Sequence, residues 1–218
     1  WSVGADLTPT FLPGASLHVT YFNNKFDGAN TAPLISSIVA APALQHLLTF
    51  YPNGATPAQI AAATAHVPQA GAMPSSVYYI YTHAQQNILN LNIKGLDIDV
   101  NYRFDTDDYG SFRIGNATTV FTKYTVQNGF GTPTYNTLNT NGIISIFPMV
   151  QTQMRTSLEW DMDPFTLGLY ANFTGGYRNW GANTVNPIQY DPVTDAPIGG
   201  GDIVKSNLTF DFHAAYDF

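Results

Sequence analysis

Alternation of apolar and polar residues over runs of about ten residues is the feature that most restricts the fold of this chain. The clearest run, 208–218, ends the sequence, and two further runs occupy 95–104 and 165–174. Successive side chains of a β-strand point to opposite faces, so each run has one apolar and one polar face. In the last run the apolar face carries Leu208, Phe210, Phe212, Ala214, Tyr216 and Phe218.

The length of these runs suits a membrane, because a tilted strand crosses a bilayer in about ten residues. Charged residues make up only 11% of the 218 residues, whereas soluble domains carry about 25%. Aromatic residues reach 14%, yet no run of about 18 apolar residues exists, which excludes a membrane-spanning helix. A membrane β-barrel reconciles these facts, because its lipid-facing and lumen-facing residues alternate.

Charge and cysteine content exclude further classes. The net charge of −7 argues against a nucleic-acid partner, which needs a basic surface. The chain has no cysteine, and therefore neither a disulfide framework nor thiolate chemistry. It starts at Trp1 without an initiator Met or a signal peptide. Since an outer-membrane protein must be exported, we expect a mature sequence and, more specifically, a fragment.

Weaker alternation brings the expected number of strands to about seven, the additional ones lying at 1–7, 17–26, 112–124 and 154–162. Short connections (8–14, 105–110, 161–164) alternate with long ones (27–86, 127–150, 181–203). Outer-membrane barrels have this sidedness, with short periplasmic turns and long extracellular loops. Because bacterial single-chain barrels have an even number of strands, seven strands predict a part of a larger barrel.

The first long loop is predicted to contain short helices. Thr56 and Pro57 are typical of an N-cap and first helical residue, ahead of a helix over 58–66. Two further helices are expected at 34–39 and 43–50, separated by Pro42. The last loop, over 186–202, is rich in Pro, Gly and Asp and is predicted to be irregular.

Residues 93–104 (IKGLDIDVNYRF), followed by Thr106 and Gly110, resemble a strand–turn–strand segment in the barrel of TonB-dependent receptors. The stretches 1–22 and 204–218 resemble neighbouring strands of the same barrel. The resemblance implies an all-β fold, a transmembrane antiparallel β-barrel of about 22 strands in all. On this reading the chain is a C-terminal part of that barrel, and its final strands follow residue 218. The aromatic ending with Phe218 favours the alternative that 218 is the true terminus.

The same resemblance implies a function. TonB-dependent receptors lie in the outer membrane of Gram-negative bacteria and actively import a scarce ligand. We expect a ferric siderophore first, and an oligosaccharide or other nutrient next. Energy reaches the family's barrels from TonB through an N-terminal plug domain, which is absent from this sequence. The expected partners are thus outer-membrane lipid, a small-molecule ligand and TonB through the missing plug.

No motif for catalysis or for a cofactor stands out. The Asp-rich stretch 105–110 begins like a calcium-binding EF-hand loop, but Tyr109 stands where that loop needs Asp or Asn, and Asn116 where it needs Glu. The five histidines lack metal-ligand spacing, and no nucleophile elbow is present. We therefore expect a protein that is not an enzyme and has no metal or cofactor.

Candidate ligand-binding residues are cations, aromatics and amides near the extracellular ends of the strands, where they could grip an anionic chelate or stack on a sugar. They are Lys123, Tyr124, Gln153, Arg155, Tyr177, Arg178 and Trp180. Trp180 and the tyrosines have an alternative role in the interfacial aromatic girdle, to which Trp160 is assigned at the opposite end.

Two other classes stay open at this point. A passive porin or structural barrel would share the alternation but need no plug. A soluble all-β binding domain would share the strands but not require detergent.

Overall fold

The computed structural model describes residues 1–68, 70–129, 131–140, 149–178, 180–181, 184–185, 189–199 and 203–218. It is mostly antiparallel β-sheet, with 57% of residues in strands, so the all-β class is confirmed. No helix in these ranges is long and apolar enough to cross a membrane.

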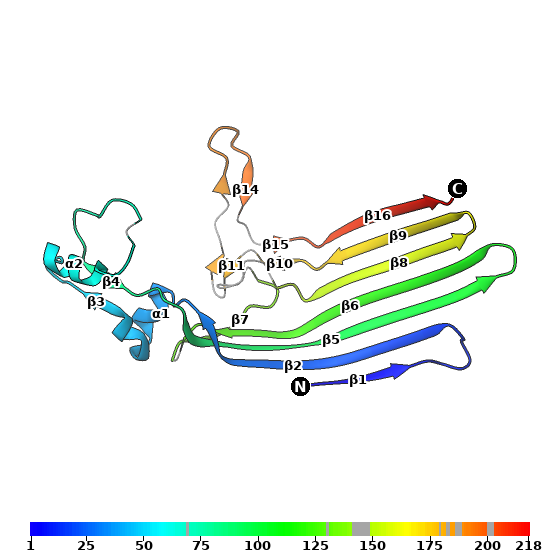
Figure 1. Cartoon of the computed structure of the whole chain (residues 1–218), viewed down its shortest axis with the longest axis horizontal. Coiled ribbons are helices and arrows are strands. Elements are labelled where there is room, and N and C mark those ends of the chain that lie inside the picture. The colour runs from blue at the N-terminus through cyan, green and yellow to red at the C-terminus, as the bar shows by residue number, and fades with distance from the viewer. Residues whose placement is uncertain are drawn as a thin grey trace. The chain divides into compact units, whose positions relative to one another are not determined.

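All seven expected strands lie side by side in one sheet (Figure 1), in the order β1-β2-β5-β6-β8-β9-β16. They are β1 (Ser2–Leu7), β2 (Ala15–Thr31), β5 (Gln86–Thr106), β6 (Gly110–Gln127), β8 (Thr152–Met162), β9 (Phe165–Thr174) and β16 (Asn207–Tyr216). A short strand, β7 (Thr134–Asn136), pairs with β6. The sheet is open, with β1 and β16 at its edges.

The alternation predicted both ends of β9 correctly but underestimated the lengths of the longest strands. β5 begins at Gln86, nine residues before the alternating run that predicted it. In this added part Ile88 and Leu89 are neighbours and both buried, so no simple alternation marks the strand. Alternation reveals only those parts of a strand that have one apolar and one polar face.

The short connections depend on glycine. Gly14 and Gly110 have φ of 87° and 73°, a region that residues with a Cβ rarely adopt. A Cβ at Gly14 would collide with the carbonyl oxygen of Arg103, and one at Gly110 with that of Asp161. The chain therefore passes tightly beside a neighbouring strand at both turns.

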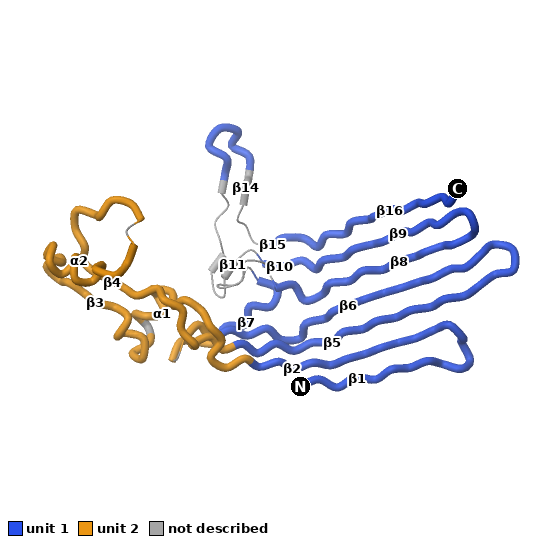
Figure 2. Tube along the Cα trace, viewed as in Figure 1, with its two compact units in different colours: residues 1–25, 91–126, 135–218 blue, residues 26–90, 127–134 orange. Residues whose placement is uncertain are grey.

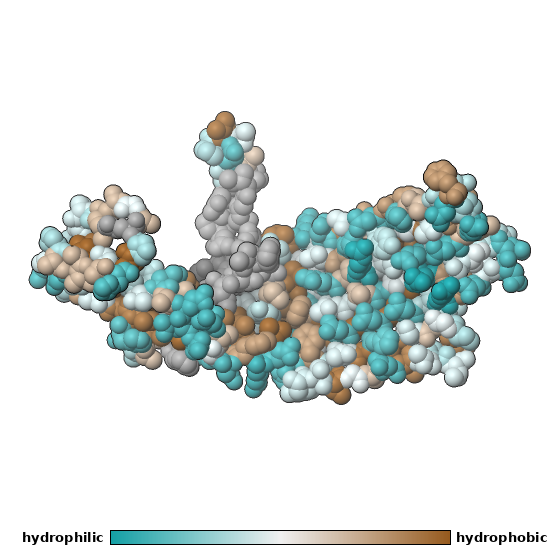
Figure 3. Space-filling model, viewed as in Figure 1, coloured by the Kyte–Doolittle hydropathy of each residue, from teal (hydrophilic) through white to brown (hydrophobic). Residues whose placement is uncertain are grey.

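The register gives the sheet one apolar and one polar face. Ile114 lies opposite Leu158, and Leu158 opposite Leu169. Leu169 lies in turn opposite Phe212, which completes an apolar row across β6, β8, β9 and β16. The other face is dominated by hydrophilic residues over these strands (Figure 3).

The chain divides into two compact units (Figure 2). The sheet unit comprises residues 1–25, 91–126 and 135–218, and the loop unit comprises residues 26–90 and 127–134. The loop unit contains α1 (Ile35–Ala40), the 3₁₀ helix η1 (Pro42–Leu47), β3 (Leu48–Phe50), α2 (Pro57–Thr64) and β4 (Tyr79–Tyr81). Its core is formed by Ile38, Ala41, Leu44 and Ile88.

Two helix predictions in the loop unit are confirmed and one is wrong in part. Thr56 caps α2 through a capping box with Gln59, and Pro57 is the first helical residue. The helix expected over 43–50 ends as η1 at Leu47, and Leu48–Phe50 forms β3 instead. The reason is non-local, because β3 pairs with β4 about 30 residues further along the chain.

The last loop contains short antiparallel ribbons where it is described. β10 (Tyr177–Arg178) pairs with β15 (Ile203–Val204), and β11 (Trp180–Gly181) with β12 (Thr184–Val185). β13 (Gln189–Tyr190) pairs with β14 (Pro197–Gly199), where an irregular loop was expected. Of the predicted loop regions, residues 69, 130, 141–148, 182–183, 186–188 and 200–202 lie outside the described residues.

A turn joins β13 and β14 through one carboxylate. The backbone N–H groups of Val193 and Thr194 donate to Asp191 Oδ1 at 2.8 and 2.9 Å. These hydrogen bonds favour the ionised form and hold the pKa of Asp191 below its ordinary value.

Candidate functional site

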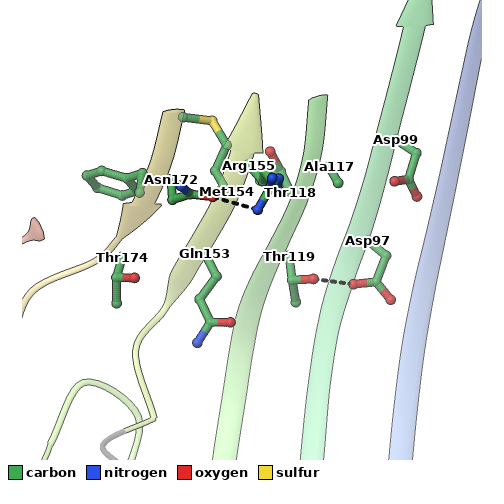
Figure 4. A pocket seen from close by; sticks show the side chains of 11 residues that line it. Asp97, Asp99, Ala117, Thr118, Thr119, Gln153, Met154, Arg155, Asn172 and Thr174 are labelled. Atoms are coloured by element: carbon green, nitrogen blue, oxygen red, sulfur yellow. Dashed lines mark hydrogen bonds between the residues drawn. The ribbon is translucent and has the colours of Figure 1, made fainter. Parts of the chain in front are cut away.

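A shallow depression of about 480 Å³ on the polar face is the best candidate site (Figure 4). Four adjacent strands, β5, β6, β8 and β9, supply its lining. Its lining residues are Asp97, Asp99, Ala117, Thr118, Thr119, Gln153, Met154, Arg155, Asn172, Phe173 and Thr174.

A chain of contacts begins beside this depression and crosses β6, β8 and β9. Arg113 pairs with Glu159 at 3.1 Å, and the hydroxyl of Tyr170 donates to the other oxygen of Glu159 at 3.1 Å. The guanidinium of Arg155 lies over the Tyr170 ring, 4.7 Å from its centre. Tyr170 thus binds an anion, Glu159, through its hydroxyl and a cation, Arg155, through its ring.

The chain of contacts continues to β16. Arg155 Nη1 donates to Asn172 Oδ1 at 3.2 Å, and Asn172 Nδ2 donates to Asp211 Oδ2 at 2.7 Å. We call the six residues from Arg113 to Asp211 the polar ladder: Arg113, Glu159, Tyr170, Arg155, Asn172 and Asp211. Its two cations and two anions balance, so the ladder gives the face no net charge.

Two carboxylates at the depression lie outside this balance. Asp97 accepts a hydrogen bond from Thr119 Oγ1 at 2.6 Å. Asp99 has neither a hydrogen bond nor an ion pair with any residue that the structure describes. The depression therefore offers carboxylate acceptors on β5 and amide groups on β8 and β9, which suits a ligand rich in hydrogen-bond donors.

An aromatic pair lies on the same face of the sheet. The rings of Phe22 and Phe121 meet edge to face at 5.9 Å. Gly95 lies beneath, where a Cβ would be 2.5 Å from Phe22 Cζ and 2.7 Å from the carbonyl oxygen of Val120. Glycine at this position therefore lets the Phe22 ring lie against the sheet.

The structure brings together only two of the seven predicted binding residues, Gln153 and Arg155, which both line the depression. Lys123 and Tyr124 are neighbours on β6 and so point to opposite faces. Tyr177 and Arg178 form β10, where the Arg178 backbone N–H donates to Asn139 O at 2.8 Å. The backbone of Trp180 belongs to β11, and its side chain lies outside the described residues.

Five of the six members of the polar ladder were absent from the sequence candidates: Arg113, Glu159, Tyr170, Asn172 and Asp211. All five lie on the polar side of runs whose alternation was recognised. Counting the polar face of every predicted strand would have found them. Their partners depend on the register between strands, which alternation does not give.

The chemistry available in the site is binding through hydrogen bonds and ring contacts. Within the described ranges, no three His, Cys, Asp or Glu side chains are grouped so as to hold a metal ion. Comparison with protein-family models, curated proteins and solved structures finds no match to this chain.

Proposed function

We propose that the sheet unit is one arc of the transmembrane barrel of an outer-membrane TonB-dependent receptor. Its apolar face contacts lipid and its polar face lines the lumen. The observation that carries the proposal is the exposed apolar row Ile114–Leu158–Leu169–Phe212, whose members are 41%, 45%, 45% and 69% exposed. Soluble monomers rarely expose a continuous apolar surface of this kind.

Aromatic residues concentrate at the turn end of the apolar face. Phe104 and Phe112 stack at 5.1 Å, and Phe165 and Tyr216 meet at 5.2 Å. Trp160 lies in the same region, where its indole Nε1 donates to the carbonyl of Tyr109 at 2.6 Å. Membrane barrels carry such aromatic girdles where lipid meets water.

The lengths of three strands also fit the thickness of a bilayer. β9 and β16 each have 10 residues and β8 has 11. At about 3.3 Å per residue and a tilt of about 40°, ten residues span roughly 25 Å, the height of the apolar band in such barrels. The Trp1–Tyr21 ring pair, at 5.5 Å, places further aromatic residues toward the loop end of β1 and β2.

The transport part of the proposal rests on the resemblance of residues 93–104 and on sidedness. Short turns lie at one end of the strands, and the long connections leave from the other (Figure 1). The favoured ligand of the receptor is a ferric siderophore, and the next candidate is an oligosaccharide. The energy for import comes from TonB through a plug domain outside this sequence. The alternative is a passive porin or structural barrel.

Membrane placement is tested by fluorescence of Trp160. The variant Trp1→Phe/Trp180→Phe leaves Trp160 as the single tryptophan and is reconstituted in bilayers of brominated phosphatidylcholine. We expect strong quenching, because bromine near the acyl chains quenches only tryptophans that contact lipid. The control is the same variant in bilayers of unbrominated phosphatidylcholine, where Trp160 should stay unquenched. A chain that stays in the aqueous phase without detergent, with Trp160 unquenched, contradicts the proposal.

Active import is tested in cells. Deleting the gene that encodes this chain should slow growth when a ferric siderophore or an oligosaccharide is the limiting nutrient, and deleting TonB should have the same effect. A passive porin would give uptake that persists without TonB and open-channel conductance in planar bilayers.

A further inference from the structure

The loop unit is almost free of charge. Asp27 is the only Asp, Glu, Lys or Arg among residues 26–90 and 127–134, whereas about a quarter of the residues in soluble domains are charged. Its histidines are His46, His66 and His83. A ligand that contacts this unit therefore meets neither a strong anion-binding cation nor a cluster of carboxylates.

The antiparallel strand pair β3–β4 of this unit gathers aromatic side chains on one face. Phe50 lies directly opposite Tyr79, and Leu48 lies opposite Tyr81. Directly opposed residues of an antiparallel pair share a face, and residues two apart along a strand do so as well. We call Phe50, Tyr79 and Tyr81 the aromatic strip. Thr49 and Ile80 occupy the other face.

The strip is exposed although its base is fixed. Phe50, Tyr79 and Tyr81 are 64%, 54% and 37% exposed. Leu48 packs against the buried core of the loop unit at the Tyr81 end of the strand pair. The outer end, with Phe50 and Tyr79, thus presents two large rings to the surroundings.

Contacts on either side of the strand pair fix the backbone of the strip. Tyr51 N–H donates to Tyr78 O at 2.7 Å, which continues the pairing beyond Phe50. At the other end the His83 ring meets Tyr81 edge to face at 5.8 Å, and His83 Nδ1 lies 3.1 Å from Pro33 O. The backbone of the strip and the Tyr81 ring are therefore ordered before a ligand binds, which lowers the entropy cost of binding.

We propose that the aromatic strip is a binding platform for a neutral oligosaccharide. A pyranose ring presents an apolar C–H face that packs on an aromatic ring, and the hydroxyls around it suit the tyrosine O–H groups. An anionic chelate would find no lysine or arginine in the loop unit to neutralise it. The inference rests on the proposed function, within which it selects the oligosaccharide.

The test uses the full chain in lauryldimethylamine oxide, a detergent without sugar groups. Maltohexaose and cellohexaose serve as neutral probes, and hexagalacturonate as an anionic probe of similar length. Binding is followed by saturation-transfer NMR, with transfer to the probe's ring protons. We expect transfer to at least one neutral probe and none to the anionic one.

Substitutions in the strip and next to it locate the contact. Phe50→Ala and Tyr79→Ala should each weaken binding about tenfold, which corresponds to about 1.4 kcal/mol. Tyr79→Phe keeps the ring and should retain most of the affinity. Tyr78→Ala is the matched control, because Tyr78 is a tyrosine of similar exposure, 53%, that precedes β4 and lies outside the strip.

Each outcome decides the inference. Neutral-probe binding that falls in Phe50→Ala and Tyr79→Ala, but not in Tyr78→Ala, supports it. It is overturned by no transfer to either neutral probe at 10 mM, by an equal loss in Tyr78→Ala, or by preference for the anionic probe or for a ferric trihydroxamate. Quenching of Trp160 by brominated lipid is independent of the strip, so failure here leaves the membrane proposal intact.

Discussion

The sheet unit and the loop unit treat apolar side chains in opposite ways. In the sheet unit, Phe212 and its row neighbours on the apolar face point outward and are exposed. In the loop unit, Ile38 and Leu44 are buried and form a small core with Ile88. Hydrophobic surface is removed from water in both cases only if lipid covers the sheet unit. On the proposed function, one chain thus carries sequence patterns suited to two different solvents.

The largest expected effect breaks the loop unit's core. Ile38→Ala removes a fully buried side chain from α1 and should lower the free energy of unfolding of the loop unit by up to about 5 kcal/mol. Hydrogen exchange of the Ala41 amide, which donates to Ser37 O, reports the change. The control is Val39→Ala, in the same helix but 59% exposed, which should change stability by less than about 0.5 kcal/mol. Equal effects would show that the core is not what holds this unit.

The next effect tests the outward-facing row of the sheet unit. Leu158→Arg places a charge where we propose lipid, and should destabilise the protein in phospholipid vesicles by about 2–4 kcal/mol. Urea unfolding followed by tryptophan fluorescence measures the loss. Ser157→Arg, the neighbouring residue on the polar face, should cost clearly less. If the two variants are equally stable, the apolar face does not contact lipid.

A smaller effect concerns the cap of α2. Thr56→Ala removes the side chain that accepts from the Gln59 backbone N–H, and should cost about 1 kcal/mol within the loop unit alone. Hydrogen exchange at Ile60, whose N–H donates to Thr56 O, should quicken, while exchange in β9 stays unchanged. Thr56→Ser retains the acceptor and serves as the control. A matching change in β9 would mean that the two units unfold together.

The smallest effect is a pH dependence at the β13–β14 turn. The pKa of Asp191 is lowered in the folded turn, so its ionised form stabilises the turn above the pKa of the unfolded chain. This stabilisation is lost as the pH falls through the folded pKa. The amide NMR shifts of Val193 and Thr194 should follow this titration. In Asp191→Asn, which cannot ionise, the same shifts should stay constant, and a titration that persists there would assign it to another group.

The strands of the sheet unit could be predicted because their signal is local. Residues 165–174 alternate on their own, and β9 has those bounds. The Thr56 cap was predictable for the same reason, since its partner Gln59 is three residues away. β3 and the ladder contact between Arg113 and Glu159 were not, because each needs a register between distant segments. The candidate site follows the same rule. Alternation predicted the polar face of the sheet, but it did not predict which polar residues contact one another.

The open edges of the sheet limit how the sheet unit could enter a bilayer, the environment that we propose for it. No strand in the described ranges pairs with the outer side of β1 or of β16, so each edge displays a row of backbone amides and carbonyls. In hydrocarbon every such unpaired group costs several kcal/mol. A ten-residue edge like that of β16 could not be carried into a bilayer unpaired. On the proposed function, both edges must therefore be paired, with each other or with further strands, wherever the sheet lies in the bilayer.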